Sequence, residues 1–207
     1  VATADDRGDS RSLAFASHAA NWYGDERAAY RYAERALRQA RAEGAVGLMP
    51  DLLVAVASSS KSLDRNVAVE TDAAEALRLA EELGQEYVAC QALSLLVWVT
   101  AVQGRSEECL RYAERCARLA AQHGLSYYGA QVRRYLGLLD MGAGQYEQAH
   151  RALLDVVRPR PHGHPVVKLF AVPDLVEAAV RSRAPREPLA PVIAEFEQWV
   201  LRGEAAY

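Results

Sequence analysis

The sequence has few of the residues that disulfide-rich, membrane-spanning or nucleic-acid-binding proteins need. It contains three cysteines in 207 residues, none of them in a Cys-x-x-Cys pair, so it has no disulfide framework and a reducing cytoplasm is the expected location. The longest apolar run, Leu93–Val102, is too short to cross a bilayer. The net charge is -3, whereas a free-standing DNA-binding domain is usually basic.

The first residues also lack any periodic pattern. Residues 1–10 have mixed charge and predict a disordered tail, whereas residues 11–207 are long enough to form one domain with a buried core. No signal peptide opens the chain, and its first residue is valine. We therefore expect a fragment of a longer protein.

An internal repeat is the strongest pattern in the sequence. Glycines recur every forty residues, and Gly24–Gly44 aligned with Gly104–Gly124 gives nine identities in 21 positions without a gap. Both segments contain the string RYAER, at Arg31–Arg35 and Arg111–Arg115. Composition alone would give about one or two identities, so the chain is built from repeats.

Each forty-residue period predicts two helices. Small or apolar residues recur at helical spacing, charged residues occupy the opposite face, and glycines at helix ends suit the left-handed conformation. Residues 61–70 are polar and predict an irregular segment, and Pro173 with Asp174 predicts where the regular part of a later helix starts. The expected helices cover residues 11–22, 25–43, 48–60, 70–83, 86–102, 105–123, 126–141, 145–157, 166–182 and 187–202.

This pattern predicts an all-α fold, a right-handed superhelix of about five helical hairpins. One hairpin cannot bury its apolar face alone, but stacked hairpins bury it together. Alanine recurs at equivalent positions, as in Ala33, Ala73 and Ala113, and allows helices to approach closely. The curved stack would present a concave face to a ligand or a partner.

The fourth repeat resembles a tetratricopeptide repeat. Leu136-Gly137, Gly144-Gln145-Tyr146 and Ala149 stand at that family's spacing, and Pro161 follows. The other repeats lack the Leu-Gly pair, and the period is 40 rather than 34. The chain is therefore similar to tetratricopeptide arrays without following their standard pattern.

Residues 100–200 also resemble the helical-repeat region of bacterial LuxR-type transcriptional regulators of the large ATP-binding class. The segments that carry this resemblance are Gly104–Cys109, Leu136–Asp140, Gly163-His164-Pro165, Ala171–Arg181 and Glu195–Trp199. The resemblance implies that the parent protein binds ATP and DNA through flanking domains absent from this chain. The chain itself has no Gly-x-x-x-x-Gly-Lys-Ser/Thr loop and implies no cofactor of its own.

Three candidates for chemistry are each weaker than a structural explanation. The pair His162-x-His164 could bind a metal, but it has no nearby carboxylate or cysteine. Cys116 could sense redox state, but it shares a repeat position with Ala36 and Ala76 and predicts a small core residue. Ser58 and Lys61 have the Ser-x-x-Lys spacing of penicillin-recognising enzymes without their other motifs. We therefore expect no catalytic activity.

The inner surface of the stack is the best candidate for a binding site. In tetratricopeptide-type arrays the first helix of each hairpin lines this surface, and the forty-residue register gives the residues that would face it. Gln91 and Ser94 interrupt an apolar helix, which favours a cavity or a neighbouring helix as their partner. Trp98 and Trp22 are either aromatic anchors for a ligand or core residues. The predicted groove residues are His18, Asn21, Asp51, Ser58, Lys61, Gln91, Ser94, Trp98, Gln131, Arg134, Asp174 and Arg181.

The sequence thus predicts a non-catalytic repeat module of a transcriptional regulator that senses a small-molecule effector or docks a flanking domain. The alternative is a scaffold that binds a protein or peptide partner without sensing a small molecule. An enclosed pocket near Gln91 and Trp98 would favour the sensor, and a long open groove would favour the scaffold. The sequence leaves open whether the chain forms a homo-oligomer, and it indicates no membrane partner.

Overall fold

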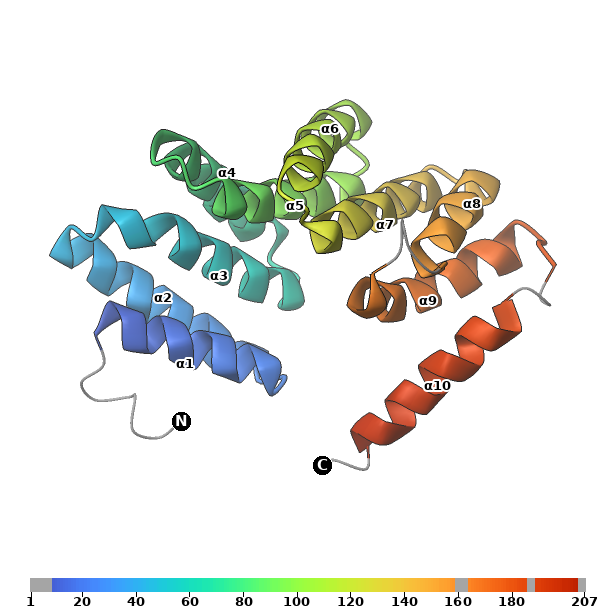
Figure 1. The fold of residues 1–207 in the computed structure, drawn as a ribbon, viewed down its shortest axis with the longest axis horizontal. Coiled ribbons are helices and arrows are strands. Elements are labelled where there is room, and N and C mark those ends of the chain that lie inside the picture. Colours follow the sequence, from blue (N-terminus) through green and yellow to red (C-terminus); the bar gives the residue numbers. More distant parts are fainter. Residues whose placement is uncertain (1–8, 159–163, 186–188, 205–207) are drawn as a thin grey trace. The chain divides into compact units, whose positions relative to one another are not determined.

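The structure of the chain is a computed structural model that describes residues 9–158, 164–185 and 189–204 (Figure 1). These residues form ten α-helices and one short 3-10 helix, with no β-strand among them, so the prediction of an all-α fold is confirmed. The chain divides into two compact units, Val1–Val99 and Thr100–Tyr207. None of the helices within the described ranges has the length and apolar character needed to cross a membrane.

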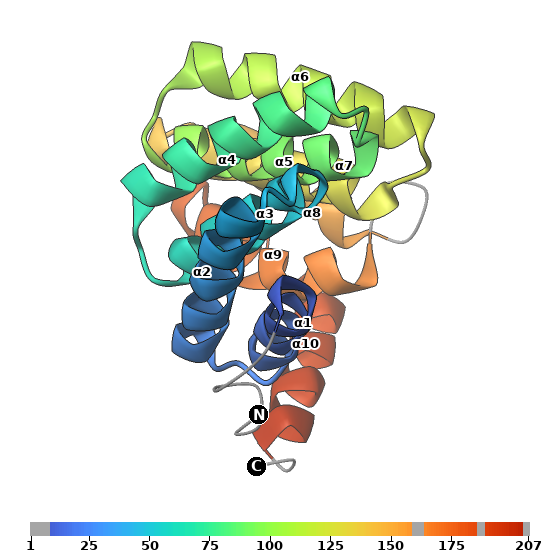
Figure 2. The ribbon, with the colours of Figure 1, turned by 90° about the vertical axis from the view of Figure 1, so that its left-hand side faces the viewer.

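The first unit stacks two complete hairpins. Helix α1 packs on α2, α2 on α3 and α3 on α4, and α1 also contacts α3 directly (Figures 1 and 2). The first helices of successive hairpins therefore lie side by side, as expected for a repeat. The elements of this unit are α1 (Ser10–Trp22), α2 (Glu26–Glu43), η1 (Val46–Leu48), α3 (Met49–Ser62), α4 (Asn66–Glu82) and most of α5 (Glu86–Val102).

The second unit repeats the same packing. Helix α6 packs on α7, α7 on α8 and α8 on α9, and α7 contacts α9 as α1 contacts α3. A hydrophobic core built around Leu153, Val156 and Leu175 joins α7, α8 and α9. The helices of this unit are α6 (Ser106–Gln122), α7 (Ser126–Gly142), α8 (Tyr146–Val157), α9 (Pro165–Arg181) and α10 (Ala190–Glu204).

The same turn ends most helices. The amide of Gln85 donates to the carbonyl of Ala80 at 2.8 Å, and the intervening Gly84 has a φ of 65°. This left-handed residue closes the helix end, and glycine occupies it without a steric penalty. Asp64 and Arg183 hold the equivalent position with φ values of 56° and 57°.

Two local predictions are wrong. Residues 61–70 are not irregular, because α3 continues to Ser62 and α4 begins at Asn66. Asp64 replaces glycine in the turn between them, and a short polar side chain tolerates the left-handed conformation. Pro173 does not start the regular part of α9, which begins at Pro165 and runs through it. Pro173 lies on the exposed side of α9, and the helix continues through it although proline donates no hydrogen bond to the carbonyl four residues earlier.

The repeated small residues form the core, as predicted. Ala33 and Ala73 are fully buried, and Ala113 is 3% exposed. Cys116 is fully buried, which confirms it as a core residue at the position of Ala36 and Ala76. Helix α5 is buried along most of its length, as its apolar sequence predicts.

The charged faces of the repeats are solvated. Arg38 pairs with Glu34 at 3.1 Å and Arg118 with Glu114 at 3.6 Å, each four residues apart on an exposed helix face. Such exposed pairs contribute little stability. The identical RYAER strings therefore keep this surface polar.

Residues 1–10 were predicted to form a disordered tail, and residues 1–8 of this segment lie outside the described residues. Ser10 already begins α1, and Asp9 caps that helix by accepting a hydrogen bond from the amide of Ser12 at 2.8 Å. This hydrogen bond is the main reason that the pKa of Asp9 is below its ordinary value.

Candidate functional site

A polar cavity lies where the first helices of three hairpins meet in the first unit. It has a volume of about 150 Å³ and receives side chains from α1, α3 and α5. Five of the predicted groove residues line it, namely His18, Asn21, Asp51, Ser58 and Gln91. We call it the inner cavity; its other lining residues are Ser17, Val54, Ala55 and Ser59.

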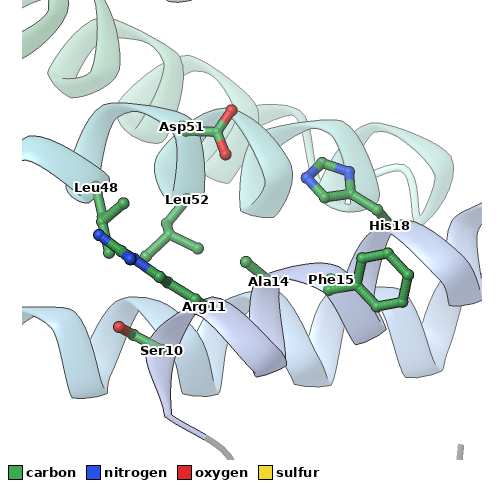
Figure 3. A pocket seen from close by; sticks show the side chains of 8 residues that line it. All are labelled: Ser10, Arg11, Ala14, Phe15, His18, Leu48, Asp51 and Leu52. Atoms are coloured by element: carbon green, nitrogen blue, oxygen red, sulfur yellow. The ribbon is translucent and has the colours of Figure 1, made fainter.

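A larger and more apolar cavity adjoins it between α1 and α3. This outer cavity has a volume of about 410 Å³ and shares His18 and Asp51 with the inner one. Figure 3 shows His18 extending from α1 and Asp51 from α3 into the space between the two helices. Its remaining lining residues are Ser10, Arg11, Ala14, Phe15, Leu48 and Leu52.

Two acceptors of the inner cavity have no partner among the residues that the structure describes. Within the described ranges, the carboxylate of Asp51 forms neither a hydrogen bond nor an ion pair, although its residue is only partly exposed. The side-chain oxygen of Gln91 is buried and accepts no hydrogen bond there. Buried polar groups in proteins are normally paired, so these two acceptors mark a place that a donor from a ligand or from water would fill.

The other predicted residues of the first unit, Lys61, Ser94 and Trp98, line neither of these two cavities. The ammonium of Lys61 lies 5.0 Å from the centre of the Trp98 ring, a distance at which a cation and an aromatic face attract. Ser94 is 6% exposed within α5. The side chain of Trp22 lies outside the described part of the chain.

The predicted residues of the second unit form a separate arrangement. The Nε of Arg134 on α7 donates to Oδ2 of Asp174 on α9 at 2.9 Å, with both side chains about one-fifth exposed. Tyr135 is buried beside this pair, and its burial raises the pKa of the phenol above the ordinary value. The structure thus brings Arg134 and Asp174 together, and each neutralises the other.

Arg181 and Gln131 also bind neighbouring side chains. Arg181 donates to the hydroxyl of Tyr146 at 3.0 Å and pairs with Glu177 at 2.8 Å. The amide nitrogen of Gln131 donates to the hydroxyl of Tyr127 at 2.8 Å, while its oxygen is buried and has no hydrogen-bond partner among the described residues. The charged groups predicted for the second unit are therefore all paired within it.

The prediction omitted several residues that line the cavities. Arg11 stands forty residues before Asp51, in the register that also contains Gln91, so the repeat could have identified it. Ser17 and Ser59 could not have been found in this way. They are buried residues whose helix positions border the predicted face rather than lie on it.

Two of the alternative chemistries, metal binding and redox sensing, gain no geometric support from the described residues. In that part of the chain, no three histidine, cysteine, aspartate or glutamate side chains gather as metal ligands would. His162 lies outside it, and His164 directly precedes α9. The three cysteines are buried free thiols, and burial raises the pKa of Cys109, which disfavours the reactive thiolate.

Comparison with known proteins gives no match for this chain, either to a protein-family model or to a curated protein. The site is therefore interpreted from its own geometry.

Proposed function

We propose that this chain is a non-catalytic repeat module that binds a small-molecule effector between α1 and α3. The observation that carries the proposal is the pair of adjoining cavities with unpartnered acceptors, Asp51 and Gln91, at their polar end. The outer cavity has the volume of a typical small-molecule site and combines apolar walls with a few polar groups.

The cavities favour an effector over an extended peptide. The inner cavity is small and polar, and Gln91 lines it. Trp98, the other residue around which an enclosed pocket was expected for a sensor, does not line it. A peptide-binding scaffold remains the alternative because the lining residues come from three successive first helices, α1, α3 and α5. A peptide lying across these helices would contact each hairpin in turn.

Binding at this place would couple to the geometry of the repeat. Helices α1 and α3 belong to successive hairpins and contact each other directly. A ligand held by both helices stabilises the hairpin arrangement that it fits best and so shifts the population of conformations. In a LuxR-type regulator, which residues 100–200 resemble in sequence, such a shift would be passed on to flanking ATP-binding and DNA-binding domains.

A compound screen with two matched variants tests the proposal. Ala14 lines the outer cavity, and Ala16 is a half-buried residue of the same helix that lines neither cavity. We expect small polar compounds that raise the melting temperature of the wild-type chain to lose this effect in Ala14→Phe, because the phenyl ring fills the cavity, and to keep it in Ala16→Phe.

The opposite result would overturn the proposal. Compounds that bind both variants equally well would lie elsewhere on the chain, and a screen without any stabilising compound would leave the cavities without a ligand. Peptides of ten residues or more that bind in an Ala14-dependent manner, without any small compound doing so, would establish the scaffold instead.

A further inference from the structure

The polarity of the two cavities specifies the chemical class of their ligand. Among the residues that the structure describes, the carboxylate of Asp51 and the amide oxygen of Gln91 in the inner cavity have no partner, and both of these groups accept hydrogen bonds. No lysine or arginine of the described ranges lines this cavity. A ligand group that satisfies both acceptors and the negative charge must be a cationic donor.

A primary ammonium has the required properties. It carries three donors and one positive charge, and it is small enough for a cavity of about 150 Å³. The hydroxyl of Ser58 and the side chain of Asn21 line the same cavity and supply further acceptors for its remaining N–H groups. A carboxylate or phosphate would instead face Asp51 at close range and be repelled by it.

The outer cavity fits the rest of such a molecule. Its apolar lining residues are Ala14, Phe15, Leu48 and Leu52, and Figure 3 shows Leu52 extending from α3 toward α1. Ser10 and Arg11 line the same cavity beside them. Phe15 is 75% exposed, which is unusual for an aromatic residue, and a bound apolar group would cover part of it. The outer cavity is therefore suited to an alkyl or aryl body next to the ammonium.

We propose that the α1–α3 site binds a small primary amine with an apolar body, its ammonium held by Asp51 and Gln91 in the inner cavity and its apolar part in the outer one. This inference rests on the proposed function and adds the class of effector. It also assigns a role to each cavity, since the inner one selects charge and the outer one supplies hydrophobic contact.

Isothermal titration with three probes of the same chain length tests the charge selection. Hexylammonium should bind at least about tenfold more tightly than hexanol or hexanoate, because a hydrogen bond between charged groups contributes more than one between neutral groups. Hexanol keeps the apolar body without the charge, and hexanoate reverses the charge.

Three substitutions locate the ammonium. Asp51→Asn should weaken hexylammonium binding by at least about tenfold and leave hexanol binding unchanged, whereas Asp51→Glu keeps the charge and should retain the preference for the amine. Asp72→Asn is the matched control, because Asp72 is another partly buried aspartate of the first unit, on α4, and lines neither cavity. It should bind hexylammonium as the wild type does.

The results separate the inference from the proposed function. Equal binding of hexylammonium and hexanol, unchanged affinity in Asp51→Asn, or no binding of hexylammonium at millimolar concentration would each overturn the amine assignment. If uncharged compounds from the screen still bind in an Ala14-dependent manner, the small-molecule site stands and only its ligand class is wrong.

Discussion

The first helices of the two units satisfy their charged residues in different ways. In the second unit, Arg134 and Asp174 stand forty residues apart and pair across α7 and α9. In the first unit, α1 and α3 make the same kind of helix contact, yet Asp51 has no partner within the described residues and faces a cavity. Equivalent pairs of first helices can therefore use their charged side chains to hold the stack together in one unit and, as we propose, to bind a ligand in the other.

The residues at equivalent repeat positions explain this difference. The position of Arg134 and Asp174 is occupied in the first unit by Ala14 and Val54, forty residues apart, which cannot pair through charge. Ala14 is also small, and a small residue facing the neighbouring helix leaves the space that the outer cavity occupies. The loss of the internal ion pair and the gain of a cavity therefore arise from the same substitutions.

The largest expected effect comes from breaking the pair in the second unit. Arg134→Met keeps the aliphatic stem but removes the guanidinium that pairs with the largely buried carboxylate of Asp174, so we expect a loss of about 2 to 3 kcal/mol in the free energy of unfolding. Asp51→Asn should change that free energy by less than about 0.5 kcal/mol, because no partner is lost. Urea denaturation followed by circular dichroism measures both.

A double variant sharpens the comparison. Replacing Asp174 with leucine in the Arg134→Met background removes the buried charge and should recover much of the lost stability. If Arg134→Met and Asp51→Asn were equally destabilising, the two positions would have the same structural role, and the distinction between the units would fail.

The sequence predicted the repeat far better than the chemistry of its faces. Periodicity specified which residues share a face, and the structure places five of the predicted groove residues, His18, Asn21, Asp51, Ser58 and Gln91, around one cavity. It could not say which polar residues pair with one another, because Arg134 and Asp174 meet only when α7 and α9 stack at a particular distance and angle. Partner choice depends on tertiary packing, which a single repeat does not encode.

The turns show the same limit on a smaller scale. Glycine spacing predicted most helix ends, but Asp64 adopts the left-handed conformation in place of glycine, so the start of α4 was placed four residues too late. Arg183 also adopts the left-handed conformation in place of glycine, one residue before the position that forty-residue spacing from Gly144 predicts. The left-handed turn conformation therefore recurs more regularly along the chain than glycine does.

Two glycines of α7 test how closely the hairpins of the second unit pack. A Cβ atom on Gly137 would lie 2.8 Å from Cγ of Leu153, which is fully buried, whereas a Cβ on Gly129 would meet nothing within 4 Å. Gly137→Ala should therefore destabilise the chain by about 1 to 2 kcal/mol through overpacking. Gly129→Ala should stabilise it by up to about 1 kcal/mol, because alanine favours the helix.

Thermal and urea denaturation of Gly137→Ala and Gly129→Ala measure the sign of each change in stability. Opposite signs would show that Gly137 permits the close approach of α7 and α8. If both substitutions stabilised the chain, Leu153 would be able to move aside. The hairpin of α7 and α8 would then be less tightly packed than the distance between Gly137 and Leu153 indicates.

The smallest effects are expected at the two left-handed positions that lack glycine, one in each unit. Arg183→Gly should raise the free energy of unfolding by about 1 kcal/mol, since a long side chain with a φ of 57° is strained. Asp64→Gly should raise it by less, because aspartate tolerates this conformation better and glycine gains more entropy in the unfolded chain. Denaturation at several urea concentrations measures both variants, with Gly104→Ala as a control that should lower stability at the equivalent turn. If Asp64→Gly stabilised the chain as much as Arg183→Gly, aspartate would be no better suited to the turn than arginine. The explanation for how Asp64 replaces glycine in the turn between α3 and α4 would then be wrong.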